Sequence, residues 1–197
     1  MLAAGAGSRF GRPKALAASA DGVPWVRRAC SLLRDAGCER VVVTLGSRAD
    51  EAAGLVPGGA DVVVVPDWRD GMSASLRAGL GTLAQGDADV AVITLVDLPG
   101  LRADAIGRLL EAPSFPPSPP GPARAMLRRA AYGGRPGHPV VIGRDHWTAV
   151  GASVTGDRGA ARYLEAHGAA VVDCTDLGGG DDVDAGPGAR SGDPAGR

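Results

Sequence analysis

Three short apolar runs, separated by stretches of helical periodicity, constrain the fold more than any other feature of this sequence. The runs cover residues 41–45, 62–65 and 90–95 and are rich in β-branched residues, which is typical of strands buried on both faces of a sheet. Helical patterns precede and separate them at 24–36, 48–55 and 73–83. This alternation predicts an α/β fold with a Rossmann-like, three-layer, mostly parallel sheet. Ligands bind such sheets beyond the carboxyl ends of the strands.

The second half of the chain keeps this alternation. Two strands, at 124–132 and 139–142, are predicted to flank the turn "GGRPGH", and they are followed by helices at 145–150 and 158–167 and a last strand at 171–172. The segment "PSFPPSPPGP" at 113–122 is too rich in proline for a helix or a central strand, so an extended surface loop is expected. The tail 185–197 has little to bury and is predicted to be disordered. We therefore expect one domain over residues 1–184.

Charge and composition exclude several classes of protein. The net charge of −1 gives no basic footprint for nucleic acid or for an anionic membrane surface. No apolar run reaches the roughly 20 residues that cross a bilayer, and the first residues lack the pattern of a signal peptide. The three cysteines Cys30, Cys38 and Cys174 show no C-x-x-C spacing, which favours reduced thiols over disulfides or zinc. These features indicate a cytoplasmic protein.

The stretch "LAAGAGSRFGRPK" at residues 2–14 combines glycines with fixed positive charge. Glycine backbones can bring N–H groups close to an anion while Arg9 and Lys14 neutralise it, so the stretch predicts a polyphosphate site. A Walker A loop is excluded because Gly11 is followed by Arg12 and Pro13. A dinucleotide-binding loop fits weakly, because only a short helical run precedes the turn at 21–22. An ordinary glycine turn leaves the two cations unexplained.

The stretch resembles the signature L-A-A-G-x-G-x-R-x-G-x-x-K of nucleotidyltransferases similar to molybdenum cofactor cytidylyltransferase. Every fixed position matches, and these positions are Leu2, Ala3, Ala4, Gly5, Gly7, Arg9, Gly11 and Lys14. The resemblance implies a fold of the nucleotide-diphospho-sugar transferase type. It also implies that the loop wraps a nucleoside triphosphate, with Arg9 and Lys14 stabilising charge on the phosphates.

Two further stretches extend the resemblance. "GMSASLRAGL" at 71–80 is similar to the G-M-S-x-S-L segment of the family, which implies that Ser73 contacts the nucleotide; Ser73 also suits the N-cap of a helix. "TLVDLPG" at 94–100 places Asp97 directly after a predicted strand, where family members hold Mg²⁺ with a D-x-P motif. The end of a strand is a suitable place for a carboxylate that binds a hard cation, although taken alone Asp97 could be a turn residue before Pro99.

Two later segments of the sequence resemble the segments that line the acceptor pocket in the family. "YGGRPGHPVVIGRDHW" at 132–147 resembles the G-x-P-G-x-P-V segment, which implies that Gly137, His138 and Pro139 line the acceptor pocket. Many relatives carry asparagine where His138 stands. "GDRGAARYL" at 156–164 resembles the next family segment and assigns Asp157 and Arg158 to the same pocket; an aspartate that caps a helix explains Asp157 equally well.

The chain departs from the family pattern at both ends. It opens inside the signature, without the apolar residues that complete the first strand in relatives, so we expect either a misassigned start or a truncated strand. At the other end the family motif D-x-D-T-P-E-D appears as residues 182–187 without its last acidic pair. Asp182 or Asp184 is the expected second metal ligand, the alternative being a polar stretch that opens the tail.

These parts predict an enzyme that moves CMP from CTP onto the phosphate of molybdenum-loaded molybdopterin and releases pyrophosphate. Mg²⁺, Arg9 and Lys14 neutralise charge, and no protein nucleophile is needed. Ala4 favours CTP over GTP by family resemblance, and a molybdoenzyme or its maturation chaperone is a candidate partner. Sugar phosphates, methylerythritol phosphate and phosphocholine stay open as acceptors, and so does a catalytically impaired binding protein. A Ser-His-Asp hydrolase built on Ser73 is discounted because "GMSAS" lacks the second glycine of a nucleophile elbow.

Overall fold

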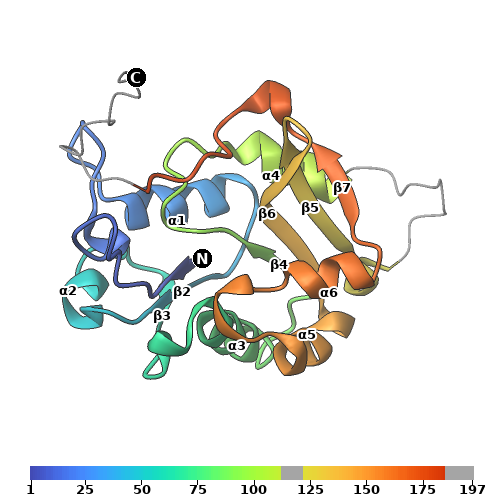
Figure 1. Cartoon of the computed structure of the whole chain (residues 1–197), viewed down its shortest axis with the longest axis horizontal. Helices are drawn as coiled ribbons and strands as arrows, with labels where there is room; N and C mark the ends of the chain where they lie inside the picture. The colour runs from blue at the N-terminus through green and yellow to red at the C-terminus, as the bar shows by residue number, and fades with distance from the viewer. Residues whose placement is uncertain (112–121, 185–197) are drawn as a thin grey trace, which may run out of the picture.

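Seven strands form the centre of the computed structural model, which describes residues 1–111 and 122–184 (Figure 1). Two sheets have the strand orders β1-β2-β3 and β4-β6-β5-β7. A bridge between Leu2 and Leu95 joins them, with Leu2 N donating to the Thr94 carbonyl at 2.9 Å. The strands are β1 (Leu2–Ala3), β2 (Val41–Leu45), β3 (Ala60–Val64), β4 (Val90–Ile93), β5 (Leu127–Tyr132), β6 (Arg135–Gly143) and β7 (Ala170–Asp173).

All strands run parallel except β6, which is antiparallel to both β4 and β5. The mostly parallel sheet predicted from the sequence is therefore confirmed. Because β4 and β5 both oppose β6, they point the same way, and the carboxyl ends of β1, β4 and β5 meet at one edge of the sheet. The segment that follows β4 and the segment that follows β1 therefore lie close together.

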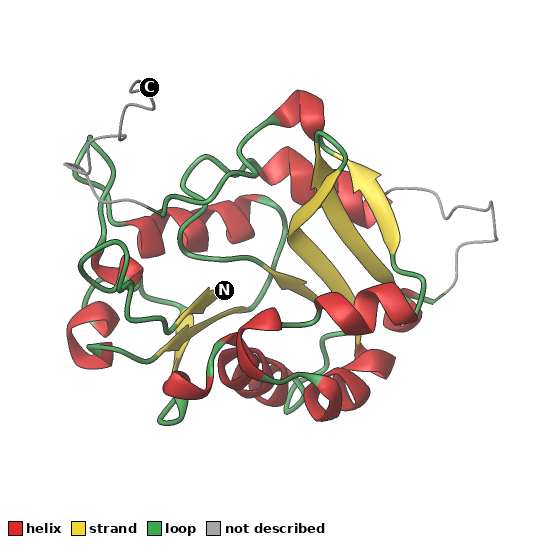
Figure 2. Ribbon diagram, in the orientation of Figure 1, coloured by secondary structure: helices red, strands yellow, loops and turns green. Residues whose placement is uncertain are grey.

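Helices cover both faces of the sheet, as Figure 2 shows. On one face α1 and α4 pack together and contact the strands, whereas α3, α5 and α6 cover the other face. The helices are α1 (Trp25–Asp35), α2 (Ala49–Ala53), α3 (Met72–Leu83), α4 (Ala103–Glu111), α5 (Trp147–Ser153) and α6 (Ala161–Ala166). Within the described ranges, no helix is long and apolar enough to cross a membrane.

Several sequence-based expectations need correction. The run 62–65 is not buried on both faces, because β3 is an edge strand and Val64 is 55% exposed. The predicted turn at 133–138 is shorter: Gly133 and Gly134 adopt positive φ and β6 already begins at Arg135. Helix α4 was not predicted at all, although its buried residues Ala105, Ile106 and Leu109 follow a helical spacing. The proline-rich segment up to residue 121 and the tail 185–197 lie outside the described residues.

The apolar core lies on both faces of the sheet, and burial differs sharply between central and edge strands. Val141 on β6 is fully buried against α4, whereas Val171 on the edge strand β7 is 58% exposed. We expect Val141→Ala to lower the free energy of unfolding by about 2–3 kcal/mol, because it removes buried methyl groups and leaves a cavity. The matched change Val171→Ala should cost less than about 0.5 kcal/mol. Urea denaturation followed by circular dichroism measures both; similar losses would contradict this account of the core.

Candidate functional site

The glycine-rich loop follows β1 directly and turns back at the carboxyl edge of the sheet. Gly7 has φ +62°, and a Cβ at this position would lie 1.9 Å from the Arg12 carbonyl oxygen. A side chain is therefore excluded at Gly7 by both the backbone conformation and the close approach of the chain. Gly5 is exposed and has no such neighbour. The loop thus closes tightly at Gly7 and leaves its backbone open to a ligand near Gly5.

Lys14 is the centre of an ion-pair network at this edge. Its Nζ atom donates to Asp97 Oδ2 at 2.7 Å and to Asp184 Oδ1 at 3.0 Å, and Arg9 lies 3.3 Å from Asp184. The side chains of Lys14 and Asp97 are 16% and 15% exposed, so the pair is shielded from water. Burial opposes the charge on Lys14, but the two hydrogen bonds outweigh it and raise its pKa. The Lys14 contact lowers the pKa of Asp184.

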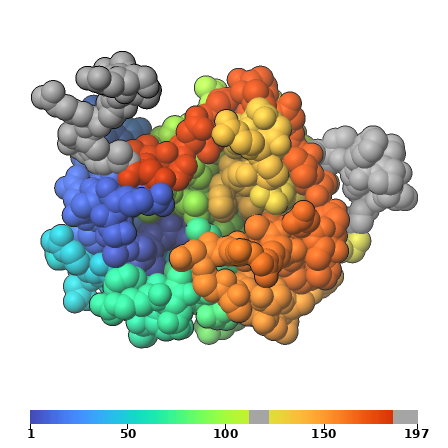
Figure 3. Space-filling model, in the orientation of Figure 1, coloured from blue at the N-terminus to red at the C-terminus, as the bar shows by residue number. Residues whose placement is uncertain are grey.

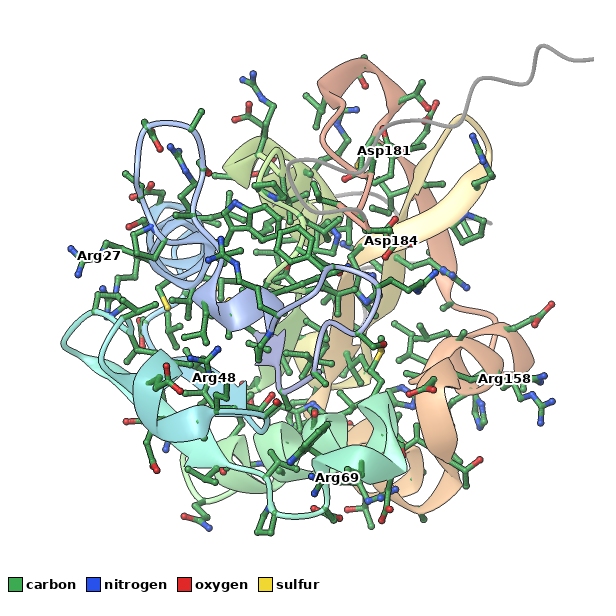
Figure 4. All side chains as sticks on the ribbon, turned by 60° about the vertical axis from the view of Figure 1, so that its left-hand side comes forward. Arg27, Arg48, Arg69, Arg158, Asp181 and Asp184 are labelled. Carbon is green, nitrogen blue, oxygen red and sulfur yellow. The ribbon has the colours of Figure 1, made fainter. Side chains whose placement is uncertain are left out.

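Asp184 reaches Lys14 because the chain after β7 crosses back over the molecule (Figure 1). Val183 N donates to the Asp97 carbonyl at 3.0 Å, and its side chain packs against the core cluster around α1. Gly179 passes so close to Gly100 that a Cβ there would lie 2.0 Å from the Gly100 carbonyl oxygen. Figure 4 shows Asp184 on this crossing segment. Asp182 is exposed and does not line the pocket beside Lys14.

A pocket of about 620 Å³ lies between the glycine loop and the start of α3, and this face is hollowed in Figure 3. The structure brings together here seven of the eight signature residues, together with Asp97 and Asp184; they are Leu2, Ala3, Ala4, Gly5, Gly7, Arg9 and Lys14, and Gly11 does not line the pocket. Met72 and Ser75, from the segment 71–80 that resembles the nucleotide-contacting segment of the family, also line the pocket, and so do Trp68 and Arg69, which sequence reasoning missed. The Arg69 guanidinium stacks 4.5 Å from the centre of the Trp68 ring. The two residues are adjacent in the sequence "DWRD" at 67–70, and nothing else in the sequence pattern indicates that they line a pocket.

The start of α3 differs from the expectation. The N-cap is Gly71, and Ser73 lies inside the helix, buried, with its hydroxyl 3.5 Å from the Asp70 carbonyl. Ser73 therefore does not cap the helix and does not line the pocket; Ser75 lines it instead. Asp157 caps the N-terminus of α3 and not that of the helix that follows it in the sequence, because Met72 N donates to Asp157 Oδ1 at 3.3 Å. A carboxylate at a helix N-terminus complements the helix dipole.

A smaller pocket, of about 110 Å³, adjoins the large one and shares Leu2 and Met72 with it. Of the residues predicted to bind the acceptor, Gly137, His138 and Arg158 line this smaller pocket. Asp157 lines the larger pocket, and Pro139 is buried in β6 outside both linings. Burial, with help from the charge of Arg129, lowers the pKa of His138 to about 4 against the opposing effect of Asp97. His138 is therefore neutral at pH 7.

Asp97 has the character of a metal ligand. While Oδ2 binds Lys14, Oδ1 is buried and has no hydrogen-bond partner among the described residues. A buried carboxylate oxygen without a partner is costly, and a hard cation would satisfy it. In residues 1–111 and 122–184 no group of three or more His, Cys, Asp or Glu residues is placed to hold a metal. Asp97 and Asp184 therefore fit a cation that takes its remaining ligands from phosphate or water.

Similarity to known proteins extends over most of the chain. The family described as "MobA-like NTP transferase domain" matches residues 1–171. The curated protein "Nicotine blue oxidoreductase" of Paenarthrobacter nicotinovorans is 37% identical, and the alignment covers 93% of this chain and 90% of that protein.

Solved structures give the same fold. Rv0371c of Mycobacterium tuberculosis H37Rv, in complex with manganese, has a TM-score of 0.66 and 26% identity over 87% of this chain and 83% of that chain. A nucleotidyl transferase of Methanothermobacter thermautotrophicus has a TM-score of 0.74 and 21% identity over 93% of this chain and 89% of that chain. These similarities confirm the predicted α/β nucleotidyltransferase fold.

Gly7 and Gly5 provide a matched test of the loop geometry. We expect Gly7→Ala to lower the free energy of unfolding by at least about 2 kcal/mol, because the methyl group would overlap the Arg12 carbonyl at a strained φ. Gly5→Ala meets open space and should change stability by less than about 0.5 kcal/mol. Thermal unfolding of the ligand-free protein measures both. Equal stability of the two variants would show that the loop does not close as described.

Proposed function

Because the chain belongs to the MobA-like NTP transferase family, we propose that it transfers CMP from CTP to the phosphate of molybdenum-loaded molybdopterin and releases pyrophosphate. One observation above all supports this proposal: Lys14 pairs with Asp97 on the wall of a 620 Å³ pocket that the glycine loop also lines. A cation and a partly unsatisfied carboxylate beside open loop backbone suit a triphosphate. Membership of this family by itself supports a nucleotidyltransferase; the nucleotide and the acceptor are the further parts of the proposal.

The residues of the pocket divide the proposed work by their chemistry. Lys14 and Arg9 exchange carboxylate partners for phosphate oxygens and offset the negative charge that develops on the leaving pyrophosphate. The loop from Gly5 to Gly7 presents backbone N–H groups to the phosphates. The acceptor phosphate oxygen attacks the α-phosphorus, a new P–O bond forms, and the bond to the β-phosphate breaks. The site thus acts by positioning and charge neutralisation.

Mg²⁺ is the proposed metal, and Asp97 and Asp184 would hold it. When bound it neutralises charge on the phosphate oxygens. The orphaned Oδ1 atom of Asp97 supports this assignment, and so does the manganese complex of the relative from M. tuberculosis.

The choice of CTP and molybdopterin rests on the resemblance of the signature, in which Ala4 favours CTP. Sugar phosphates, methylerythritol phosphate and phosphocholine are the competing acceptors. With molybdopterin as acceptor, a molybdoenzyme or its maturation chaperone is the proposed partner. The cytoplasm, which keeps thiols reduced, is the proposed location.

A second candidate function is an oxidoreductase, favoured by the name of the relative that is 37% identical. The sequence offers it little support, since Pro13 interrupts the glycine loop and the pattern of a dinucleotide-binding loop fits weakly. Oxidation of NADH or NADPH in the presence of nicotine blue, at a rate proportional to enzyme, would establish this function. Its absence together with pyrophosphate release would exclude it.

The decisive experiment measures pyrophosphate release from CTP and from GTP, with Mg²⁺, in the presence and absence of molybdenum-loaded molybdopterin. Release from CTP that requires the acceptor is the expected result. Release from GTP alone would correct the nucleotide, and release with another phosphate acceptor would correct the acceptor. CTP binding without release from any acceptor would support a binding protein in place of an enzyme.

Variants of the ion pair test the proposed roles directly. We expect Lys14→Ala to lower kcat/KM by roughly 30- to 1000-fold, which is about 2–4 kcal/mol of transition-state stabilisation. Asp97→Asn should abolish turnover that depends on Mg²⁺. Arg27→Ala is the control, because Arg27 is exposed on α1 and points away from the pocket in Figure 4. Near-full activity of either site variant would show that this pocket is not the active site.

A further inference from the structure

A third cavity, of about 400 Å³, lies at the edge of the sheet where β2 and β4 begin, opposite the carboxyl edge that carries the glycine loop. The strands β2 and β4 belong to separate sheets and are not hydrogen-bonded to each other. Met1 lies between them (Figure 1) and lines the cavity. We call this cavity, which residues 41–42 and 90–93 border, the strand slot.

The slot exists because β1 is shorter than both of its neighbours. Leu2 pairs with Thr44 of β2 and forms a bridge with Leu95, which follows β4. However, β2 already begins at Val41 and β4 at Val90. Among the described residues no strand stands between these first residues of β2 and β4. The short β1 therefore holds its neighbours apart by the width of one strand, and the slot continues its line.

The backbone groups that border the slot are arranged for a parallel strand. Met1 N donates to the Val42 carbonyl at 2.8 Å, and Thr44 N donates to the Met1 carbonyl at 3.1 Å. On the other side, Leu2 N donates to the Thr94 carbonyl at 2.9 Å. In a parallel ladder, alternate residues direct both their N–H and their C=O groups to the same neighbour. The N–H groups of Val42 and Thr94 therefore point into the slot.

The side chains that line the slot are apolar on both faces of the sheet. Leu76, Leu80 and Leu83 of α3 lie on one face, whereas Leu33 of α1 and Leu110 of α4 lie on the other. The charged lining residues precede β2 and β4 and are Glu39, Arg40, Asp87 and Asp89. Successive side chains of a strand point to opposite faces, so each residue of an inserted strand would meet leucines. The slot thus suits consecutive apolar residues, as in β2, which is buried throughout.

The amino group of Met1 lies at the inner end of the slot. It is buried, and burial lowers its pKa to about 6. A charged group in an apolar cavity is unfavourable. An amide at this nitrogen would carry no charge and could keep the hydrogen bond to the Val42 carbonyl. The inner end of the slot is therefore more suitable for a peptide bond than for an ammonium group.

We propose that the strand slot binds an extended apolar segment of about four residues, joined to the amino group of Met1, which pairs with β2 and β4 as a parallel strand. The residue next to Met1 would accept a hydrogen bond from Thr94 N, and the residue before it would accept one from Val42 N. The segment would lengthen β1 and so hold the glycine loop that follows β1. This proposal is independent of the proposed function, because it involves neither nucleotide nor acceptor.

Two extensions of the full chain at Met1 test the proposal by thermal unfolding. The apolar extension is Val-Ile-Val-Val, and the matched polar extension is Ser-Gly-Asp-Ser. We expect the apolar extension to raise Tm by at least about 5 °C, because it buries apolar area in the slot. The polar extension should change Tm by less than about 2 °C. Equal changes of Tm in the two proteins would overturn the proposal.

Hydrogen exchange followed by NMR locates the added segment. In the apolar extension, the amides of Val42 and Thr94 should exchange at least about tenfold more slowly relative to the amide of Val43. Val43 is the internal control, because it is the next residue of the ladder and its N–H points to β3. If the relative exchange of Val42 and Thr94 is unchanged, the proposal fails even where Tm rises, since the segment would then bind elsewhere.

A variant that fills the slot provides a second, independent test. Leu83→Trp places a larger side chain in the slot from α3, and we expect it to remove at least about half of the gain in Tm that the apolar extension gives. Leu55→Trp is the control, because Leu55 is a half-buried leucine that does not line the slot. Equal gains in the two backgrounds would contradict the proposal. Binding of an anilinonaphthalene sulfonate dye to the apolar extension, without protection of the two amides, would assign the cavity to a small ligand instead and overturn it.

Discussion

A lysine shared by two carboxylates connects the distant parts of this protein. Lys14 binds Asp97, which follows a central strand, and Asp184, which lies 170 residues further along the chain. Such charge-assisted bonds are strong where water is largely excluded. Because both carboxylates accept hydrogen bonds from one ammonium group, this group fixes the glycine loop, the segment after β4 and the last described segment relative to one another. The candidate site is thus also a place where distant segments of the fold are held together.

The sheet explains why these groups can meet. Parallel strands carry their following residues to a common edge, so β1 delivers the glycine loop and β4 delivers Asp97 to the same place. The antiparallel strand β6 runs in the other direction and begins at this edge, which brings Gly137 and His138 beside the pocket. The start of β6 therefore forms a second wall of the pocket. If β6 ran parallel to its neighbours, its first residues would lie at the opposite edge of the sheet.

The two pockets differ in the way their positive charge is held. In the larger pocket, Lys14 and Arg9 are paired with carboxylates. In the smaller pocket the Nε atom of Arg129 is buried without a hydrogen-bond partner in the described part of the chain, and burial lowers the pKa of His138.

The sequence by itself determined the α/β class, the positions of most strands and the residues of the glycine loop, because these follow from local periodicity and from spacing within one short segment. It also predicted that Asp97 follows a buried strand, while its role as a metal ligand rests on the family resemblance and stays a prediction. It misplaced Ser73 and left Trp68, Arg69 and Arg129 unnoticed, because burial and pocket lining depend on which helix face meets the sheet. Only the tertiary structure decided that Asp157 caps α3, that Asp184 reaches Lys14 and that the Nε atom of Arg129 is buried without a partner among the described residues. Those facts depend on contacts between segments far apart in the chain, and neither spacing nor composition carries that information.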